Sequence, residues 1–214
     1  MKRTYGVLIL AGGKGRRMGG ANKALLQLQQ QTFLSRLENA LSDFDEKLIS
    51  LQDASWLGDS PFLPVFDQVA DRGPMEGLRC SLSLCRSDAL LVVACDMPLF
   101  SGKLAKAMLQ AGEGFDAVIC QDRAGRIHPL CGIYSKQCLP AIESMIARGN
   151  YKITDIMKAV PSLIFSLETS VFSDMLLSNI NTPEALEALR QDKSLERSTP
   201  IDRIAGGCCV TSSL

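Results

Sequence analysis

The sequence lacks a charge imbalance and any long apolar run. Lysine plus arginine and aspartate plus glutamate both number 23, so the formal net charge is zero, and a nucleic acid or an anionic membrane is not indicated as a partner. No apolar stretch approaches the roughly 20 residues that span a bilayer. The short apolar run after Thr4 leads into glycines rather than a cleavage site, so no secretory signal is expected. We therefore expect a cytoplasmic protein.

Histidine and cysteine chemistry also has little support. His128 is the only histidine, so a Ser-His-Asp or Cys-His mechanism would have to use it, and no nucleophile motif accompanies it. The eight cysteines contain no C-x-x-C pair with a matching second pair, so a zinc site is not supported. Most of them are expected to be small buried side chains with free thiols.

What the sequence does contain is a glycine-rich, strongly basic segment directly after an apolar run. Residues 6–10 read Gly-Val-Leu-Ile-Leu, and residues 10–23 read Leu-Ala-Gly-Gly-Lys-Gly-Arg-Arg-Met-Gly-Gly-Ala-Asn-Lys. A buried strand followed by glycines allows several backbone N–H groups to converge on an anion. The lysines and arginines add cationic donors, and arginine can bind a phosphate through two N–H groups at once. The spacing fits neither the P-loop nor the dinucleotide-binding motif, yet it predicts a phosphate-binding loop.

The order Leu-Ala-Gly-Gly-x-x-x-Arg-Met-Gly, followed by a lysine, resembles the signature of nucleotidyltransferases built like molybdenum cofactor guanylyltransferase. Three later stretches extend this resemblance in the same order along the chain. They lie at residues 64–67 with 73–77, at 94–98 and at 179–184. The resemblance covers about residues 5 to 190 and implies a fold like that of the nucleotide-diphospho-sugar transferases.

Apolar runs alternate with helix-like patterns along the chain, which is typical of α/β proteins. We expect a single Rossmann-like three-layer α/β/α domain over residues 1–191, with a mostly parallel twisted sheet. Residues 192–214 lack a clear amphipathic period and are expected to form a mobile or loosely docked tail. Strands are expected at residues 7–10, 47–51, 63–66, 89–94, 117–120 and 132–134, and helices at 33–41, 75–84, 104–111, 141–146 and 153–160.

Asp96 directly follows an apolar run and is the best candidate for a metal ligand. Ligands of open parallel sheets bind outside the carboxyl ends of the strands, so the glycine-rich loop and Asp96 are expected to meet. Mg²⁺ binds through one or two carboxylates plus substrate phosphates and retained waters, so one aspartate is sufficient. Asp96 could instead cap a helix that starts near Pro98, but the resemblance favours the metal.

The resemblance implies that Arg17, Lys23 and Asp96 are catalytic. The two cations would neutralise the triphosphate and the departing pyrophosphate, and Asp96 would bind Mg²⁺. Lys23 has an alternative interpretation as a solvated residue at the start of a helix. The resemblance implies nucleotide contacts by Leu10, Ala11, Gly12, Gly13, Arg16, Lys23, Ser50, Asp67, Gly77, Asp96, Asn179 and Asn181.

Three of these positions carry a second interpretation. Ser50 stands where the family has asparagine, which leaves its nucleotide contact open. Asn179 and Asn181 are spaced to share one face of an extended segment, but they also precede a good helix start, with Thr182 as N-cap and Pro183 as first residue. Both interpretations of the asparagines are compatible. In similar proteins the His-Pro step lies toward the pterin substrate, which gives His128 a functional reading beside a structural one.

The resemblance implies a Mg²⁺-dependent enzyme that transfers GMP from GTP to molybdenum-molybdopterin, with molybdoenzyme-maturation proteins as further partners. The phosphate of the acceptor is already an anionic nucleophile, so no protein base is required. Three alternatives remain: a cytidylyltransferase acting on the same pterin, a sugar-phosphate nucleotidylyltransferase, and a non-catalytic carrier of the pterin cofactor. The Ala-Gly-Gly order at residues 11–13 favours GTP by resemblance, and the presence of Asp96 favours an enzyme over a carrier.

Overall fold

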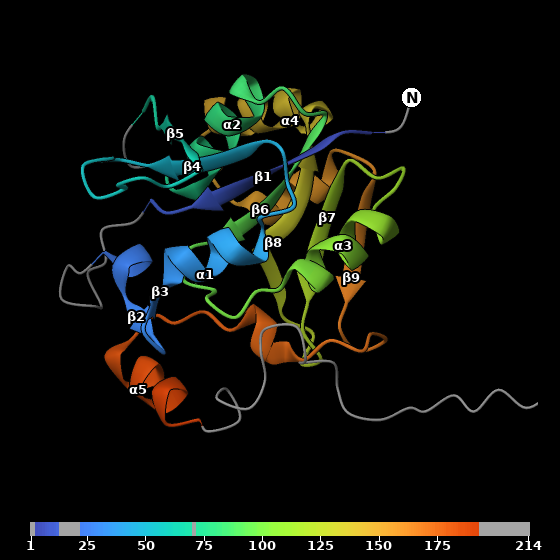
Figure 1. The fold of residues 1–214 in the computed structure, drawn as a ribbon. Helices are drawn as coiled ribbons and strands as arrows, with labels where there is room; N and C mark the ends of the chain where they lie inside the picture. The colour runs from blue at the N-terminus through green and yellow to red at the C-terminus, as the bar shows by residue number, and fades with distance from the viewer. Residues whose placement is uncertain (1–2, 13–21, 70–71, 193–214) are drawn as a thin grey trace, which may run out of the picture.

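A seven-stranded sheet forms the centre of the computed structural model, which describes residues 3–12, 22–69 and 72–192 (Figure 1). β8 is antiparallel to both of its neighbours, β6 and β7, whereas the other neighbouring pairs are parallel. The predicted mostly parallel sheet is therefore confirmed. In spatial order the strands are β5 (Leu63–Phe66), β4 (Lys47–Leu51), β1 (Tyr5–Leu10), β6 (Ala89–Ala94), β8 (Ile127–Ser135), β7 (Ala117–Gln121) and β9 (Ser162–Ser166).

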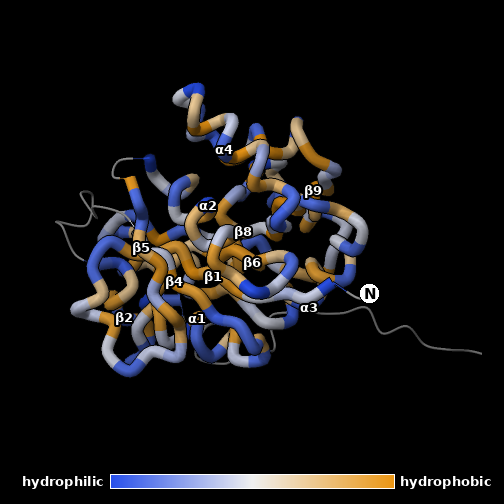
Figure 2. The backbone as a smooth tube through the Cα atoms, turned by 90° about the horizontal axis from the view of Figure 1, so that it is seen from above, coloured by the Kyte–Doolittle hydropathy of each residue, from blue (hydrophilic) through white to orange (hydrophobic). Residues whose placement is uncertain are grey.

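Helices cover both faces of this sheet and give the three predicted layers. α1 (Phe33–Ala40) and α3 (Gly102–Ala111) pack on one face, and α2 (Pro74–Leu84) and α4 (Leu139–Ala147) pack on the other (Figures 1 and 2). Successive residues of β1 enter the two hydrophobic clusters alternately, because side chains of a strand point to opposite faces. The central strands are buried on both faces, which explains why they read as continuous apolar runs.

A third hydrophobic cluster lies beside the sheet and joins two distant parts of the chain. The hairpin of β2 (Gln27–Leu28) and β3 (Gln31–Thr32) packs against α5 (Pro183–Gln191) (Figure 1). The short helix η2 (Lys23–Leu25) immediately precedes this hairpin. Docking of α5 therefore brings the segment before it close to the chain that follows the glycine-rich loop.

Several elements differ from the sequence predictions. The predicted α-helix over residues 153–160 is a 3-10 helix, η4 (Ile153–Lys158), and β9 and the β2–β3 hairpin were not predicted. Two further 3-10 helices are η3 (Lys136–Cys138) and η5 (Asp174–Leu177). The predicted helix start at Thr182 is confirmed, since its hydroxyl accepts a hydrogen bond from the Ala185 N–H at 3.2 Å.

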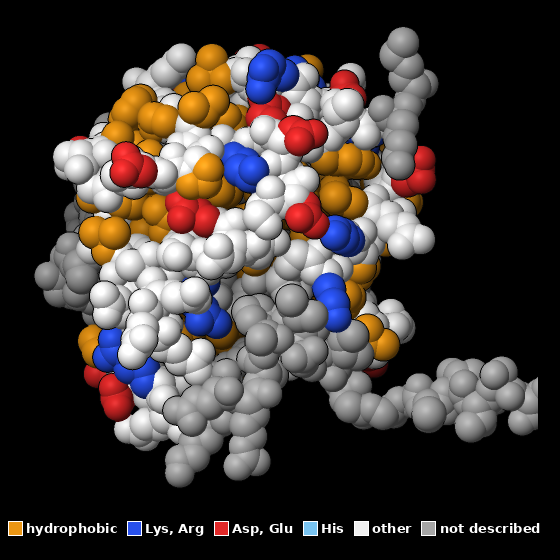
Figure 3. Space-filling view, viewed as in Figure 1, with side chains coloured by type: hydrophobic (Ala, Val, Ile, Leu, Met, Phe, Trp, Pro, Cys, Tyr) orange, Lys and Arg blue, Asp and Glu red, His pale blue; other side chains and the backbone are white. Residues whose placement is uncertain are grey.

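The edge strand β5 carries exposed apolar side chains. Leu63 is 62% and Phe66 is 50% exposed, and hydrophobic atoms gather over this side of the molecule, at the upper left of Figure 3. Pro64 lies within the strand. Because proline has no backbone N–H, it disfavours pairing of this edge with another strand. Among the described residues, no helix is long and apolar enough to span a bilayer.

Candidate active site

The carboxyl ends of three neighbouring strands converge at one edge of the sheet. The Cys95 N–H donates to the Leu10 carbonyl at 3.0 Å, and the Ala11 N–H donates to the Ser50 carbonyl at 2.8 Å. These bonds extend the ladders at the ends of β1, β4 and β6, so the residues that follow each strand emerge side by side. The start of the glycine-rich segment, at Leu10 and Ala11, thus lies beside Cys95, which directly precedes Asp96.

Lys23, Asp96 and Asn181 form a polar cluster at this edge. The Lys23 Nζ donates to Asp96 Oδ2 at 3.0 Å and also to Asn181 Oδ1. The lysine and aspartate side chains are 23% and 15% exposed. The interpretation of Lys23 as a merely solvated residue at a helix start is therefore wrong, because its ammonium is held between two side chains from distant parts of the chain.

The second carboxylate oxygen of Asp96 has no hydrogen-bond partner among the described residues. Asp96 Oδ1 is buried and accepts no hydrogen bond from the described residues. The alternative of a helix cap is wrong, since α3 begins at Gly102 and the Ser101 hydroxyl caps it by accepting from the Leu104 N–H at 3.2 Å. A buried polar atom without a partner costs free energy, so this oxygen is suited to a ligand that is itself a cation.

The segment around Asn181 is fixed to Asp96 through the backbone. The Ile180 N–H donates to the Asp96 carbonyl at 2.8 Å, and Ile180 packs into the cluster formed with α5 and the β2–β3 hairpin. Asn181 Oδ1 thereby reaches the cluster. Asn179 is exposed and takes no part in the hydrogen bonds of the cluster. The helix start and the site contact thus coexist for Asn181.

These residues fit a magnesium ion that is completed by a substrate. The oxygens available are those of Asp96 and the amide oxygen of Asn181. Within the described residues no group of three or more histidine, cysteine, aspartate or glutamate side chains could hold a metal. Mg²⁺ commonly takes one or two carboxylates and obtains its remaining ligands from phosphates and water, which is compatible with this small donor set.

A second group of predicted residues meets between β4, β5 and α2. The Ser50 hydroxyl donates to Asp67 Oδ1 at 3.3 Å. Gly77 packs directly on this pair, because a Cβ there would lie 2.3 Å from Ser50 Oγ and 3.1 Å from Leu10 Cδ2. Burial raises the pKa of the Asp67 carboxyl, although the Ser50 hydrogen bond opposes the shift. The structure thus brings together four of the residues for which nucleotide contacts are predicted, namely Leu10, Ser50, Asp67 and Gly77.

Only the start of the predicted loop lies within the described residues. Ala11 and Gly12 begin it, and a Cβ at Gly12 would meet no atom within 4 Å. Gly13, Arg16 and Arg17 lie outside the described residues, as does the predicted tail after Asp192. The phosphate-binding role of this loop and the role of Arg17 stay predictions.

The sequence reasoning missed a buried carboxylate within one of its own motifs. Glu76 in the first turn of α2 has no exposed surface, and it pairs with Arg79 at 2.7 Å and with Arg72 at 3.5 Å. Hydrogen bonding from Arg79 lowers the pKa of Glu76 despite burial. The spacing of these arginines, three residues after and four residues before Glu76, is the signal that could have identified the network.

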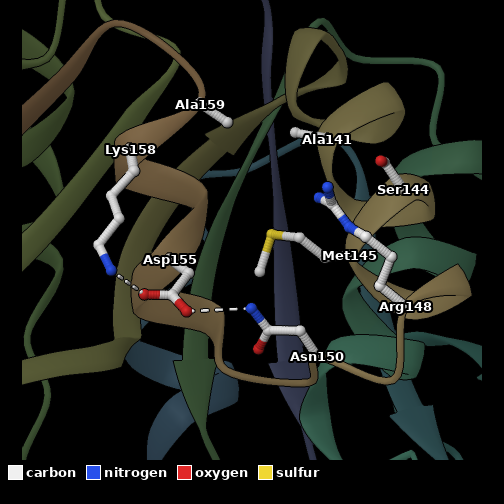
Figure 4. Close-up of a pocket in the computed structure, with 8 residues that line it drawn as sticks. All are labelled: Ala141, Ser144, Met145, Arg148, Asn150, Asp155, Lys158 and Ala159. Atoms are coloured by element: carbon white, nitrogen blue, oxygen red, sulfur yellow. Dashed lines mark hydrogen bonds and ion pairs between the residues drawn. The ribbon is translucent and has the colours of Figure 1, made fainter.

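A separate cavity of about 350 Å³ lies between α4 and η4 (Figure 4). Asp155 occupies one wall and binds Lys158 at 2.6 Å and Asn150 at 3.0 Å, while Arg148 lies on the opposite side. None of the predicted site residues lines this cavity. It is therefore distinct from the polar cluster of Lys23, Asp96 and Asn181.

The fold and the edge site define the class of protein. Molybdopterin-guanine dinucleotide biosynthesis protein A from Archaeoglobus fulgidus has a similar structure, with a TM-score of 0.73 at 22% identity, covering 86% of this chain and 96% of that one. The 2-C-methyl-D-erythritol 4-phosphate cytidylyltransferase from Thermus thermophilus gives a TM-score of 0.65 at 19% identity, covering 92% and 100%. At these identities the likeness shows the fold, which is that of nucleotidyltransferases.

Sequence comparisons identify the family. The family model of the MobA-like NTP transferase domain matches residues 7–163. A "Probable molybdenum cofactor guanylyltransferase" from Methanosarcina mazei is 34% identical over 203 residues, covering 87% of this chain and 90% of the relative. Another of the same name from Pelotomaculum thermopropionicum is 34% identical over 198 residues, covering 89% and 93%. The chain therefore belongs to the MobA-like NTP transferase family and is a nucleotidyltransferase, which confirms the resemblance drawn from its motifs.

Proposed function

We propose that this protein transfers GMP from GTP to molybdenum-bound molybdopterin, forming molybdopterin guanine dinucleotide and pyrophosphate. The observation that carries the proposal is the cluster of Lys23, Asp96 and Asn181 at the carboxyl ends of β1 and β6, directly after the glycine-rich motif. The names of the relatives support the choice of nucleotide and acceptor. We propose the cytoplasm as its location, in keeping with the six cysteines of the described residues, all of them buried free thiols.

The reaction exchanges one phosphoryl bond for another. An oxygen of the acceptor phosphate forms a bond to the α-phosphorus of GTP, and the bond from that phosphorus to the oxygen bridging to the β-phosphate breaks. The electron pair leaves with pyrophosphate, and no proton has to be removed because the attacking phosphate is already anionic. Catalysis of such a transfer depends on alignment and charge neutralisation, for which Lys23 supplies an ammonium within the site.

Asp96 and Asn181 have a different role from Lys23. Asp96 Oδ1 has no partner within the described part of the chain, and Asn181 Oδ1 lies in the same cluster, so these oxygens would hold Mg²⁺. When bound, the ion neutralises and aligns the phosphates. Lys23 fixes the other oxygen of Asp96, which orients the carboxylate before any ligand arrives.

Ser50, Asp67 and Gly77 are proposed to hold the nucleoside. The absence of a side chain at Gly77 keeps the start of α2 close to β1 and β4, where backbone N–H groups of a helix start can approach a ligand. The Ser50 hydroxyl orients Asp67. We also propose that molybdoenzyme-maturation proteins receive the product.

The first test is pyrophosphate release by the purified protein with Mg²⁺ and molybdate-loaded molybdopterin. GTP, CTP, ATP and UTP are supplied in turn with the pterin, with a sugar phosphate in its place, or with neither. Release with GTP that requires the pterin is the expected result. Release with CTP would change the product but not the mechanism, release with sugar phosphates alone would change the acceptor, and tight pterin binding without any release would indicate a carrier.

A further inference from the structure

The connection between β5 and α2 joins two of the residues proposed to hold the nucleoside. Asp67 directly follows β5, Gly77 lies near the start of α2, and this helix packs against β4 and β5 (Figure 1). The structure describes the connection at residues 67–69 and 72–73. The shape of this connection decides where the Asp67 carboxylate lies relative to the start of α2. The inference below rests on the proposed function.

One guanidinium binds both ends of this connection. Arg79 Nη2 donates to Gln68 Oε1 at 2.9 Å and to Glu76 Oε1 at 2.7 Å, and Arg79 Nε donates to Glu76 Oε2 at 3.2 Å. Gln68 is the residue next to Asp67. The contact from Arg79 to Gln68 spans 11 residues, so it is not a local contact within the helix. Arg79 therefore ties the end of β5 to the first turn of α2.

Glu76 is the anchor of this guanidinium and of a second one. Its carboxylate has no exposed surface, and its Oε2 also lies 3.5 Å from Arg72 Nη1. Arg72 directly precedes Gly73, whose φ of 62° lies in the left-handed region that favours glycine. Glu76 thus fixes the residue before this turn as well as the arginine that reaches Gln68.

The residues proposed for the nucleoside are in contact with this network. A Cβ at Gly77, the residue after Glu76, would lie 2.3 Å from Ser50 Oγ, and the Ser50 hydroxyl donates to Asp67. Burial is the main cause that raises the pKa of Asp67, and the negative charge of Glu76 raises it further. The two carboxylates are therefore near enough to interact through their charges. A change at Glu76 would reach Asp67 both through Arg79 and through the field.

Stability alone does not explain a buried network of this kind. Replacing a buried ion pair by apolar side chains of similar volume is often neutral or stabilising, because removing charges from water offsets their attraction. The helix dipole favours a glutamate in the first turn of a helix, but an exposed glutamate would gain that benefit without losing its hydration. Directional hydrogen bonds to an arginine fix one geometry of the connected segments. The network is thus suited to holding the connection in a single arrangement.

We propose that Glu76 is a positioning residue for the nucleoside: by anchoring Arg79, it holds Asp67 in the place where this carboxylate contacts GTP. Glu76 does not touch the nucleotide itself, since its side chain is wholly buried. Its effect passes through Gln68, the neighbour of Asp67. Loss of the network therefore weakens the contacts to the nucleoside and spares those to the triphosphate, which Lys23 and the metal neutralise.

The test compares the binding of GTP with that of inorganic triphosphate to the full chain, each with Mg²⁺, by isothermal titration calorimetry. Gln68→Ala removes an exposed side chain and leaves the buried pair intact, so the variant folds. It is expected to raise the dissociation constant for GTP about threefold, and Glu76→Gln about tenfold, as the loss of hydrogen bonds to a charged group does. Both variants should leave the dissociation constant for inorganic triphosphate unchanged.

Glu46→Gln is the matched control. Glu46 is also buried, at 8% exposure, and its carboxylate accepts from the N–H groups of Arg86 and Ser87 at 2.7 and 2.8 Å. It precedes β4, at the amino end of the strands and away from the proposed site. The variant should lose stability as Glu76→Gln does, but it should keep both dissociation constants.

The outcomes separate positioning from a structural role. Equal weakening of GTP and triphosphate binding in Glu76→Gln, or unchanged GTP binding in Gln68→Ala, would overturn the inference. If Glu76→Gln does not fold, Gln68→Ala decides alone. Pyrophosphate release by the wild type is measured separately. Without release the proposed function fails, whereas a loss of GTP affinity that spares triphosphate still supports the positioning. A wild-type chain that does not bind GTP would overturn both.

Discussion

Asp96 combines one carboxylate oxygen held by Lys23 with another that is buried and accepts no hydrogen bond from the residues that the structure describes. We predict that Asp96→Ala lowers the rate of transfer by about 10²- to 10³-fold, as loss of one electrostatic group of a site does, while the folded structure persists. Mg²⁺-dependent pyrophosphate release and thermal unfolding measure the two effects. The matched control is Asp43→Ala, which removes an exposed aspartate paired with Lys106 at 2.7 Å. Retained Mg²⁺-dependent turnover in Asp96→Ala would remove Asp96 from the metal role.

Lys23 is expected to act on the triphosphate. Lys23→Ala removes the ammonium from the cluster together with the contact that orients Asp96, so we predict a higher KM for GTP and a lower kcat. Steady-state kinetics at saturating pterin measures both constants, with Lys106→Ala as the control for loss of an exposed lysine of an ion pair. Unchanged kinetics would mean that Lys23 only stabilises the fold.

Asp67 should show a conflict between stability and function. Its folded pKa is raised above 3.8 by burial, so the unfolded chain ionises first as pH rises, and the protein loses stability between pH 3.8 and the folded pKa. Asp67→Asn keeps an oxygen for the Ser50 hydroxyl and removes this cost. We predict that the melting temperature of Asp67→Asn, relative to that of the wild type, increases as the pH rises through this window. The KM of the variant for GTP at pH 7 should also increase. A lower melting temperature at pH 7 would contradict this account.

At the scale of elements, the start of α2 depends on the absence of a side chain. Alanine has a helix propensity about 1 kcal/mol better than glycine, but a Cβ at position 77 would lie 2.3 Å from Ser50 Oγ. Overpacking of this kind costs about 1 to 3 kcal/mol, so the clash outweighs the propensity and Gly77→Ala should destabilise the protein. Urea unfolding of Gly77→Ala, Ser50→Ala and the double variant measures the coupling. Additive losses in the double variant would show that Ser50 is not the obstacle.

The elements that could be predicted from the sequence are those whose burial is indicated by a local pattern of apolar residues. The strands of the central sheet are continuous apolar runs because helices cover both faces, and their carboxyl ends follow from the parallel order. β9 was missed because serines stand at both of its ends and Ile164 at its centre is exposed. The β2–β3 hairpin was missed because Gln29 and Gln30 adopt positive φ values of 51° and 63° in its turn, where glycine or asparagine is the usual signal.

The candidate site was predictable only in part for a related reason. Motif order and the strand-end rule were enough to bring Lys23 near Asp96. Glu76, by contrast, is a carboxylate at the start of a helix that looks solvated in the sequence, and its burial arises only from the packing of α2 and from its pairing with Arg79. Burial produced by tertiary contacts leaves no local signal in a single sequence.

At the scale of the whole molecule, the third hydrophobic cluster depends on α5, the last helix of the described residues. Leu186 and Leu189 of α5 pack with Leu28 and Phe33. We therefore predict that a chain ending at Asp192 keeps the melting temperature and the transfer activity of the full chain. A chain ending before Pro183 should lose both, because it exposes that cluster and detaches the Asn181 segment. Thermal unfolding and pyrophosphate release of the two truncated chains distinguish these outcomes.

The Lys23 ammonium is bound by residues 73 and 158 positions further along the chain. Contacts between such distant residues form only after the intervening chain has been synthesised and ordered. A nascent chain that has already produced every strand of the sheet, through Ser166, still has no Asn181 to bind Lys23 and Asp96. The cluster of Lys23, Asp96 and Asn181 therefore forms only after nearly all of the described chain has been made, and a chain that stops before Asn181 lacks one of its three members.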